Sequence, residues 1–570
     1  MTGKVQWWKN AVVYQVYLRS FQDSNGDGIG DLKGIEERLP YLQELGVDVI
    51  WISPMFQSPM DDNGYDISDY YKVDPVFGTN EDMYRLIAEA GKRGIRIILD
   101  LVVNHCSDEH EWFRRACENE NSIEAGYFYF KRTADGGEPN NWRSNFGGSV
   151  WSRLEDGRWY YHTFSPKQPD LNWENPMLRK EIYKMVNWWL DKGIAGFRID
   201  AITFIKKDLS FAPVETEDGK RYPVENFENY PGIGNFLTEL KQETFDRHDC
   251  FTVAEAPGVE QEDFCKYAGE DGFFSMIFDF SWESMEGEKD KSSPEAVERL
   301  KKKLFESQKF VSGRGWCGVF LENHDQARCL NRYLEKKDRN YYSASALATL
   351  YFFLHGTPYI YQGQEIGMEN SVWKSVDELA DTRAKITWEE KLRQGEDSGK
   401  LLKYFNDWGR DNARTPMQWS DEENAGFTKG TPWLKVQDNY REVNVKKQQE
   451  EQNSLLTYYK ELIRIRKEEA LADIMCKGEF SPLLEEEQGV IAYKRDYEGK
   501  KLIVLVNMQS RKAALEPGLC RRVLGEAFGK EPLFGNYIGV EIEGGKVMLQ
   551  PYQALVAAAG IEAIHIGGSA

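Results

Sequence analysis

The chain has 570 residues, more than one ordinary core can hold, which predicts two to four domains. Its formal net charge of -21 argues against a nucleic-acid partner, because binding to phosphates needs a basic surface, and favours a neutral substrate. No apolar run approaches the roughly twenty residues of a membrane span, and the first residues lack the apolar centre of a signal peptide. We therefore expect a soluble, cytoplasmic protein without a membrane partner.

The first predicted strand, residues 12–18, is followed by the loop DSNGDGIGD. Asp23, Asn25 and Asp27 match the opening of an EF-hand, but its twelfth position holds Gly34 where a bidentate Glu is required. This favours a hard-cation loop of another kind, because acidic groups packed so tightly repel one another unless a cation neutralises them. The alternative is a solvated acidic turn. The ligands would be the side chains of Asp23, Asn25, Asp27 and Asp31 and the carbonyl of Ile29.

Apolar runs alternate with amphipathic helices along most of the chain. The near-continuous apolar character of the runs is typical of strands that are covered on both faces. Eight such units predict a (β/α)8 TIM barrel. The expected strands are residues 12–18, 47–53, 95–103, 194–201, 250–256, 274–280, 316–325 and 357–363. The clearest helices are 35–46, 81–94, 179–193, 295–310, 345–356 and 455–469.

Three segments depart from this alternation. The excursion after the third strand is too long for a plain loop and predicts a small inserted domain. Short alternating strands from about residue 476 onward predict a C-terminal antiparallel β domain. The polar segment from about 370 to 412 reads as an extended loop. The predicted division is therefore 1–104 and 175–475 for the barrel, 105–174 for the inserted domain and 476–570 for the C-terminal domain.

Acidic residues stand at or after the ends of several predicted strands, where the chemistry of such barrels takes place. They are Asp100, Asp200, Glu255 and Asp325. Several carboxylates on one rim raise one another's pKa, which makes a purely structural role for all four a poor explanation. The sequence offers no obvious catalytic metal, His–Cys pair or nucleophilic serine motif. Paired carboxylates are typical of glycoside hydrolysis.

The segments DLVVNH, GFRIDA, TVAEAPG and ENHDQAR resemble the four catalytic regions of the α-amylase superfamily of glycoside hydrolases. The stretches DDNGYDISDY, QPDLNWENP and RDNARTPMQW are similar to those of its oligo-1,6-glucosidase and α-glucosidase branch. The resemblance runs nearly the full length. It implies a retaining, exo-acting α-glucosidase that removes terminal glucose from short oligosaccharides, mainly at α-1,6 bonds with some α-1,4 activity. It also implies a structural Ca2+ in the opening loop, with Mg2+ as the alternative, no organic cofactor, and a monomer or weak oligomer.

The resemblance also implies a role for each site residue. Asp200 would be the nucleophile, kept ionised by Arg198, and Glu255 the general acid and base, its pKa raised by a dry pocket and neighbouring acids. Asp325 would stabilise the distorted sugar, and Asp100 would orient Arg198. The terminal glucose would be bound by Asp62, Tyr65, His105, Phe164, His324 and Arg414.

Two residues depart from the pattern of the branch. Ala201 follows the nucleophile, where relatives that prefer α-1,6 bonds usually have Val, so the linkage preference stays open. Gln364 stands where Glu is common and is expected to alter the charge near the entrance. The alternatives are an α-1,4-preferring α-glucosidase, a trehalose-6-phosphate hydrolase, which would need a basic patch, and a sucrose isomerase, which would need an arginine-rich loop after the seventh strand. A non-catalytic relative of transporter ectodomains is disfavoured, because those lack the carboxylates.

Overall fold

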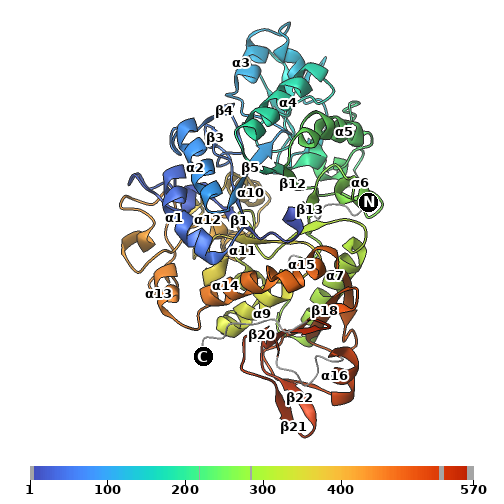
Figure 1. The fold of residues 1–570 in the computed structure, drawn as a ribbon. Coiled ribbons are helices and arrows are strands. Elements are labelled where there is room, and N and C mark those ends of the chain that lie inside the picture. Colours follow the sequence, from blue (N-terminus) through green and yellow to red (C-terminus); the bar gives the residue numbers. More distant parts are fainter. Residues whose placement is uncertain (1–5, 217–218, 283–284, 525–531, 562–570) are drawn as a thin grey trace.

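A computed structural model describes residues 6–216, 219–282, 285–524 and 532–561. Eight parallel strands close into a barrel in the order β1-β15-β14-β13-β12-β10-β5-β2 (Figure 1). All eight fall within the runs that the sequence predicts as strands, so the barrel prediction is confirmed. The strands are β1 Val13–Val16, β2 Val49–Ile52, β5 Arg96–Val102, β10 Gly196–Asp200, β12 Phe251–Ala254, β13 Met276–Phe278, β14 Cys317–Phe320 and β15 Thr357–Tyr361.

A helix follows each strand and covers the outside of the barrel. Local signals set the ends of these helices: α2 begins with a capping box between Thr79 and Asp82, and α1 ends at Gly46, whose φ of 92° few other residues tolerate. The outer helices are α1 Leu32–Leu45, α2 Asn80–Lys92, α4 Pro176–Asp191, α5 Ile233–Glu243, α6 Phe264–Ala268, α7 Pro294–Val311, α9 Tyr341–Phe352 and α14 Leu455–Arg466. The smaller helix α8, Cys329–Tyr333, precedes α9.

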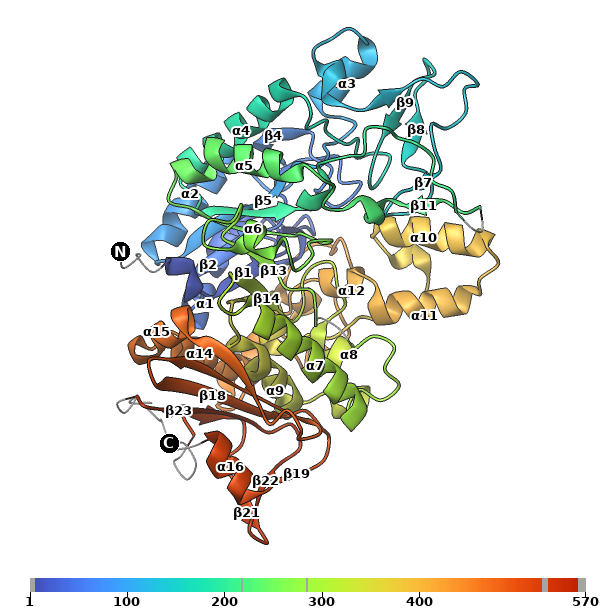
Figure 2. The same cartoon turned by 90° about the vertical axis from the view of Figure 1, so that its right-hand side faces the viewer.

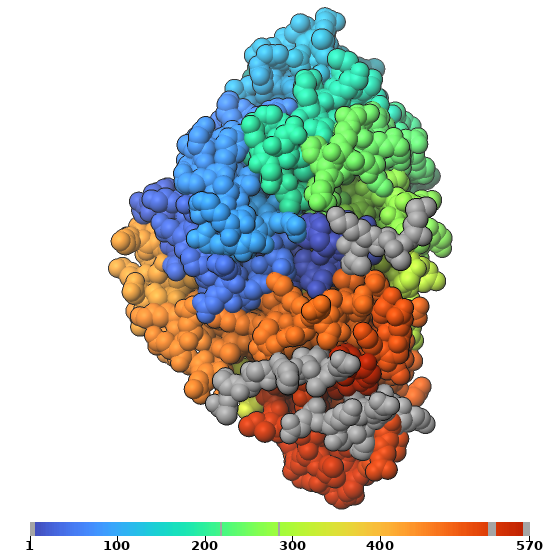
Figure 3. Space-filling view, viewed as in Figure 1, coloured from blue at the N-terminus to red at the C-terminus, as the bar shows by residue number. Residues whose placement is uncertain are grey.

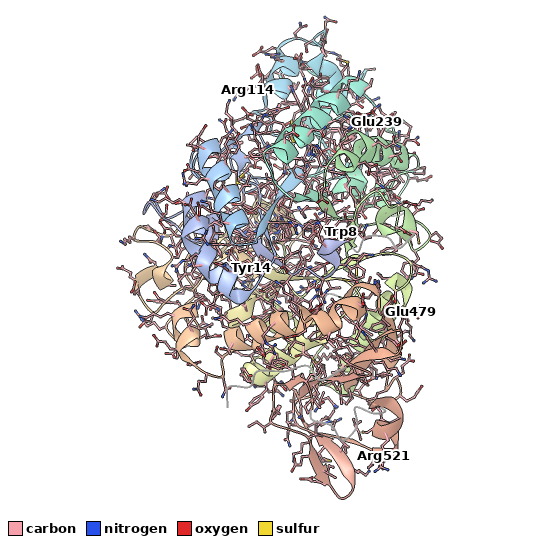
Figure 4. All side chains as sticks on the ribbon, viewed as in Figure 1. Trp8, Tyr14, Arg114, Glu239, Glu479 and Arg521 are labelled. Atoms are coloured by element: carbon pink, nitrogen blue, oxygen red, sulfur yellow. The ribbon has the colours of Figure 1, made fainter. Side chains whose placement is uncertain are left out.

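The interior of the barrel is filled by side chains, so it is a core and not a channel. Large residues such as Trp51, Phe278 and Tyr359 pack there, and Trp8 lies against Phe251 near the amino ends of the strands. Figure 4 labels Trp8 and Tyr14 near the middle of the molecule. Aromatic side chains thus fill the interior and the amino end of the barrel. The acidic residues predicted as the site lie at its other end, where the strands finish.

The inserted segment after β5 and the connections after β2 and β10 form small sheets above the barrel. Strands β6, β9 and β8 pair as one antiparallel sheet, β7 pairs with the later strand β11, and β3 pairs with β4. A bridge between His105 and Asp170 closes the base of the segment. The elements are α3 Glu111–Glu118, β3 Phe56–Gln57, β4 Asp69–Val73, β6 Phe130–Lys131, β7 Trp142–Arg143, β8 Trp151–Arg153, β9 Trp159–Tyr161 and β11 Tyr222–Pro223.

The C-terminal part is an antiparallel β structure at the opposite end of the molecule from α3 (Figure 3). It contains a five-stranded sheet, β16-β17-β18-β23-β20, and a three-stranded sheet, β19-β22-β21. The bounds are α15 Glu469–Lys477, β16 Glu479–Leu483, β17 Val490–Tyr497, β18 Lys500–Asn507, β19 Ala513–Leu515, α16 Pro517–Leu524, β20 Phe534–Gly535, β21 Glu541–Glu543, β22 Lys546–Leu549 and β23 Ala554–Ala559. The exact domain boundaries stay a prediction.

The segment from 370 to 412 differs from the extended loop that its polarity suggests. It contains two helices, α10 Thr382–Arg393 and α11 Ser398–Trp408, which project from the side of the barrel (Figure 2). Asp381 and Asp397 cap their amino ends, and a small apolar cluster that includes Trp373 and Phe405 holds them together. The turn α12, Asp411–Arg414, and helix α13, Val445–Glu450, follow. Among the described helices, none combines the length and apolarity needed to cross a bilayer.

Candidate active site

The guanidinium of Arg198 on β10 joins three carboxylates at the carboxyl end of the barrel. Its Nη1 lies 2.8 Å from Asp100 and 2.7 Å from Asp200, and its Nη2 contacts Glu255. Strand order explains this meeting, because β10 lies between β5, which carries Asp100, and β12, which ends just before Glu255. Asp200 and Glu255 therefore lie close together on neighbouring nitrogens of one arginine.

Sharing Arg198 changes its expected effect on Asp200. Burial raises the pKa of Asp200 to about 7, because Arg198 only partly offsets the loss of water and Asp100 and Asp325 oppose ionisation. Arg198 therefore favours the ionised form of Asp200, as expected, but does not offset the whole effect of burial. Burial also raises the pKa of Glu255 to about 7, again against Arg198, and Asp200 and Asp325 add to the rise. Two close carboxyls with raised pKa values readily share one proton near neutral pH.

Asp325 has a different environment from the other two acids. Its Oδ1 lies 2.7 Å from Arg414 Nη2 and 3.1 Å from Arg410 Nη1, and its Oδ2 lies 3.3 Å from His324 Nε2. Burial opposes ionisation, but His324, Arg410 and Arg414 hold the pKa of Asp325 below its ordinary value. Asp325 therefore favours its ionised form more strongly than Asp200 and Glu255 do.

Tyr65 and His324 lie beside these acids and are fixed by buried polar contacts. The Tyr65 hydroxyl lies 3.1 Å from Asp100 and 2.5 Å from His324 Nε2, and the two rings stack with centroids 5.4 Å apart. Gln15 contacts the other ring nitrogen of His324 at 2.8 Å. Burial lowers the pKa of His324 to about 3. Burial thus favours the neutral imidazole, and both of its ring nitrogens already have partners, Gln15 and Tyr65.

A second group of predicted binding residues lies where the inserted segment meets the barrel. Gln168 Nε2 lies 3.1 Å from Asp62 Oδ2 and 3.1 Å from His105 Nε2. The Phe164 ring packs edge-on against His105 at 5.2 Å. Burial raises the pKa of Asp62 to about 7, opposed by Arg410 and Arg414. Contacts through Arg410 join this group to Asp325, so the predicted site residues form one connected cluster.

Ala201, directly after Asp200, has an unusual backbone conformation. Its φ of 41° and ψ of 37° place it in the left-handed region, which is uncommon for residues other than glycine. In this conformation its backbone N–H acts to lower the pKa of the Glu255 carboxyl, against the larger effect of burial. Its side chain belongs to an apolar cluster with Trp142 and Phe204. Residue 201 therefore couples the nucleophile strand, the acid and the inserted segment.

Sequence reasoning missed three residues of this cluster. Arg410 joins Asp325, Asp62 and Asp381, and its spacing of four from Arg414 within RDNAR was a usable signal, because such pairs share a helix face. Gln168 stands in the stretch QPDLNWENP, which already pointed to this region.

Lys207 is the third missed residue. It is buried, with 4% of its surface exposed. Its Nζ lies 2.5 Å from Asp170 and 2.9 Å from the amide oxygen of Asn104, and it also contacts the Phe204 carbonyl. It therefore joins the loop that carries His105 to the loop that follows Asp200. Only its position in IKKD, soon after the nucleophile, hinted at this contact.

Gln364 does not lie where the sequence suggested. It is 2% exposed, and its amide donates to the hydroxyls of Tyr351 on α9 and Tyr459 on α14, at 3.0 and 2.8 Å. The expectation that it alters the charge near the entrance is therefore wrong. The two tyrosine hydroxyls give a neutral amide suitable partners inside this helix layer.

The opening loop folds around its own side chains. Asp23 accepts hydrogen bonds from the backbone N–H groups of Asn25, Gly26 and Gly28, and Asp31 caps α1 through Gly34. Within the described residues, no group of three or more His, Cys, Asp or Glu side chains converges as a metal cluster. The all-oxygen donor set nevertheless has the chemistry that Ca2+ and Mg2+ prefer.

Two cavities reach the acids at the carboxyl end of the barrel. One, of about 430 Å3, is lined by Asp325, Asp381, Arg410 and Trp408 among others, and the other, of about 670 Å3, begins at Glu255. A larger cavity of about 810 Å3 lies at the amino ends of the strands, beside Trp8 and Trp316, and contains none of the site residues. Two close carboxyls beside a third, charged one can perform acid and nucleophilic catalysis on a glycosidic bond.

Comparisons with known proteins agree with this chemistry. The family described as "Alpha amylase, catalytic domain" matches residues 15–474. An oligo-1,6-glucosidase of Parageobacillus thermoglucosidasius is 43% identical over 96% of this chain and 98% of its own length. An oligo-1,6-glucosidase of Halalkalibacterium halodurans is 44% identical over 97% of this chain and 98% of its own length.

A solved structure gives the same result at the level of the fold. The trehalose-6-phosphate hydrolase of Bacillus licheniformis superposes with a TM-score of 0.86 at 37% identity, covering 97% of this chain and 99% of that one. The resemblance expected from the sequence motifs is thereby confirmed.

Proposed function

Because this chain belongs to the alpha-amylase family and is a glycoside hydrolase, we propose that it releases glucose from the non-reducing end of short α-glucosides, chiefly isomalto-oligosaccharides. The observation that carries the proposal is the shared contact of Asp200 and Glu255 with Arg198, beside the charged Asp325. The identity of more than 40% to two oligo-1,6-glucosidases over nearly the full length supports the choice of substrate.

In the first step Asp200 attacks the anomeric carbon while Glu255 protonates the departing oxygen. The raised pKa of Glu255, caused mainly by burial, keeps this proton available near neutral pH. Asp325 stays ionised between two arginines and stabilises the positive charge that develops on the sugar ring.

In the second step Glu255 takes a proton from water, which then releases glucose from Asp200. Two inversions at the anomeric carbon give net retention, and this route requires carboxyls about 5 Å apart instead of a wider pair. The contact of both carboxyls with one guanidinium supports the narrow spacing. His105, His324, Asp62, Tyr65, Phe164 and Arg414 would hold the terminal glucose.

The opening loop would hold one Ca2+ through Asp23, Asn25, Asp27, Asp31 and the Ile29 carbonyl. When bound, the ion would supply charge neutralisation and rigidity to the connection between β1 and α1. The proposed function includes no organic cofactor.

A side-by-side assay of glucose release tests the proposed function. We expect isomaltose and panose to be cleaved fastest, maltose more slowly, and sucrose and trehalose poorly. Faster cleavage of maltose than of isomaltose would replace the α-1,6 preference with an α-1,4 preference. Preferential cleavage of trehalose-6-phosphate, or conversion of sucrose to an isomer, would instead establish one of the alternative activities.

A further inference from the structure

Two segments that are far apart in the sequence meet beside the candidate active site. The inserted segment contributes β7 and the turn 144–148 that follows it, and helix α10 lies next to β7 (Figure 2). Arg143 Nη2 of β7 lies 3.0 Å from Glu390 Oε2 of α10. Among the residues that the structure describes, no other ion pair joins the inserted segment to the α10–α11 helix pair.

The turn 144–148 packs tightly against α10 at this ion pair. The side chains of Arg143 and Glu390 are only 31% and 25% exposed. A Cβ atom at Gly147 would lie 2.6 Å from Glu390 Oε2 and 3.3 Å from Ile386 Cγ2, so a side chain there would displace the carboxylate. The φ of Gly147 is 111°, which also favours glycine. Both properties of residue 147 thus allow the turn to lie directly on the helix.

The same turn carries an aromatic side chain to the predicted glucose-binding residues. Phe146 is 5% exposed, its ring lies 5.5 Å from that of Phe164, and the Arg410 guanidinium lies 5.3 Å from its centroid. Asn145 Nδ2 lies 2.9 Å from Glu225 Oε1 in the connection after β10. Phe146 is therefore part of the wall beside the catalytic cluster, on a turn that is fixed from two sides.

The catalytic acids are held by contacts that do not involve this turn. Arg198 contacts Asp200 and Glu255, and Arg414 contacts Asp325. Loosening the turn should therefore change the wall of the glucose site while the nucleophile and the proton donor stay in place. A change that weakens substrate and transition state equally raises KM and leaves kcat unchanged.

We propose that Arg143 and Glu390 are positioning residues that hold Phe146 in the wall of the glucose site. The inference rests on the proposed function, because it assigns the wall that holds the sugar in the same site. The ion pair joins the inserted segment to α10 and so closes one side of the site. Its loss should weaken the binding of the glucose ring, both in the substrate and as the free product.

Glu390→Gln tests the proposal, because it removes the charge and keeps the size of the side chain. We expect KM for isomaltose and Kd for glucose to rise together by about two- to fivefold, the range that a partly exposed ion pair contributes, while kcat stays close to that of wild type. Glu389→Gln is the matched control. Glu389 is 73% exposed and 3.8 Å from Arg393, so this variant should leave both constants unchanged.

A double-mutant cycle distinguishes this pair from two independent effects. Arg143→Gln should give the same rise as Glu390→Gln, and the double variant should show no further rise, because both changes remove one interaction. Thermal melting confirms that each variant folds, and a contact with a structural role alone would lower Tm without moving KM or Kd. Unchanged constants in folded Glu390→Gln, or additive effects in the double variant, would overturn the inference.

The two constants also separate this inference from the proposed function. Failure of the wild-type protein to cleave isomaltose would refute the proposed function. Calorimetric titration with glucose would then still test the inference, because Kd does not depend on which glucoside is cleaved. A wild-type protein that cleaves isomaltose, with the same glucose Kd as folded Glu390→Gln, would overturn the inference and leave the proposed function standing.

Discussion

Arg198 shows how single residues set the chemistry of this site. One guanidinium contacts Asp100, Asp200 and Glu255 and so brings these acids together. Asp325 is held separately by Arg410 and Arg414. Asp200, Glu255 and Asp325 all carry a carboxyl group, but their surroundings shift its pKa in different directions. Burial raises the pKa of Asp200 and Glu255, whereas Asp325 stays ionised.

Amide replacements test the three roles. Asp200→Asn, Glu255→Gln and Asp325→Asn should each lower kcat by about three or more powers of ten, because an amide can neither attack nor transfer the proton nor carry the charge. Circular dichroism and thermal melting should show an intact fold. Near-normal activity of Asp200→Asn would refute its assignment as the nucleophile.

The raised pKa of Glu255 predicts a pH-dependent stability. Burial shifts its pKa from 4.5 to about 7, so the folded state favours the protonated carboxyl. This contribution is fully present below about pH 4.5 and is lost as the pH rises through 7. Glu255→Gln removes the titrating group. Its Tm relative to wild type should therefore become more favourable between pH 5 and pH 8. Parallel Tm curves for the two proteins would contradict this account.

The left-handed conformation of Ala201 predicts that Ala201→Val affects both stability and specificity. A β-branched residue at a φ of 41° is strained, which should lower the free energy of unfolding by about 1–3 kcal/mol. The added methyl groups should also lower the maltose rate relative to isomaltose, since such groups are worth about 1–3 kcal/mol of discrimination. Ala201→Gly is the control, because glycine tolerates this φ. An unchanged ratio of the two specificity constants would limit residue 201 to packing.

At the scale of elements, the barrel strands were predictable and the connections were less so. Strands such as β5 and β14 could be predicted because each is an apolar run between polar segments and is buried in the structure. Helices α10 and α11 were missed because their sequences are charged and their apolar contacts are few. Gln364 was misplaced because a polar residue in a motif reads as exposed unless its partners, here two distant tyrosines, are known.

The opening loop makes a prediction at the same scale. Chelation should lower the Tm by several degrees while activity at room temperature changes little, because the loop belongs to the β1–α1 connection and not to the acids of later strands. Differential scanning fluorimetry with and without added Ca2+ measures this. Asp27→Asn should reduce the stabilisation by Ca2+, since it removes one charged ligand. A rapid and complete loss of activity on chelation would give the ion a catalytic role.

At the scale of the molecule, the carboxyl ends of several barrel strands and two further segments assemble one site. Strand order brings Asp100, Asp200 and Glu255 together, the inserted segment contributes Phe164, and the turn α12 contributes Arg414. Strand-end acids were predictable from the sequence because parallel strands end on one rim. The contacts of Arg410, Gln168 and Lys207 could not be predicted from the sequence, because they depend on how distant loops pack above that rim.

Retention of the α configuration tests the central claim most directly. Proton NMR of the first-formed product from isomaltose distinguishes the anomers before mutarotation mixes them. Asp200 as a nucleophile beside Glu255 predicts that α-glucose appears first and that the β-anomer grows in later. Initial β-glucose would mean that water attacks directly, and it would contradict the assignment of Asp200 as the nucleophile.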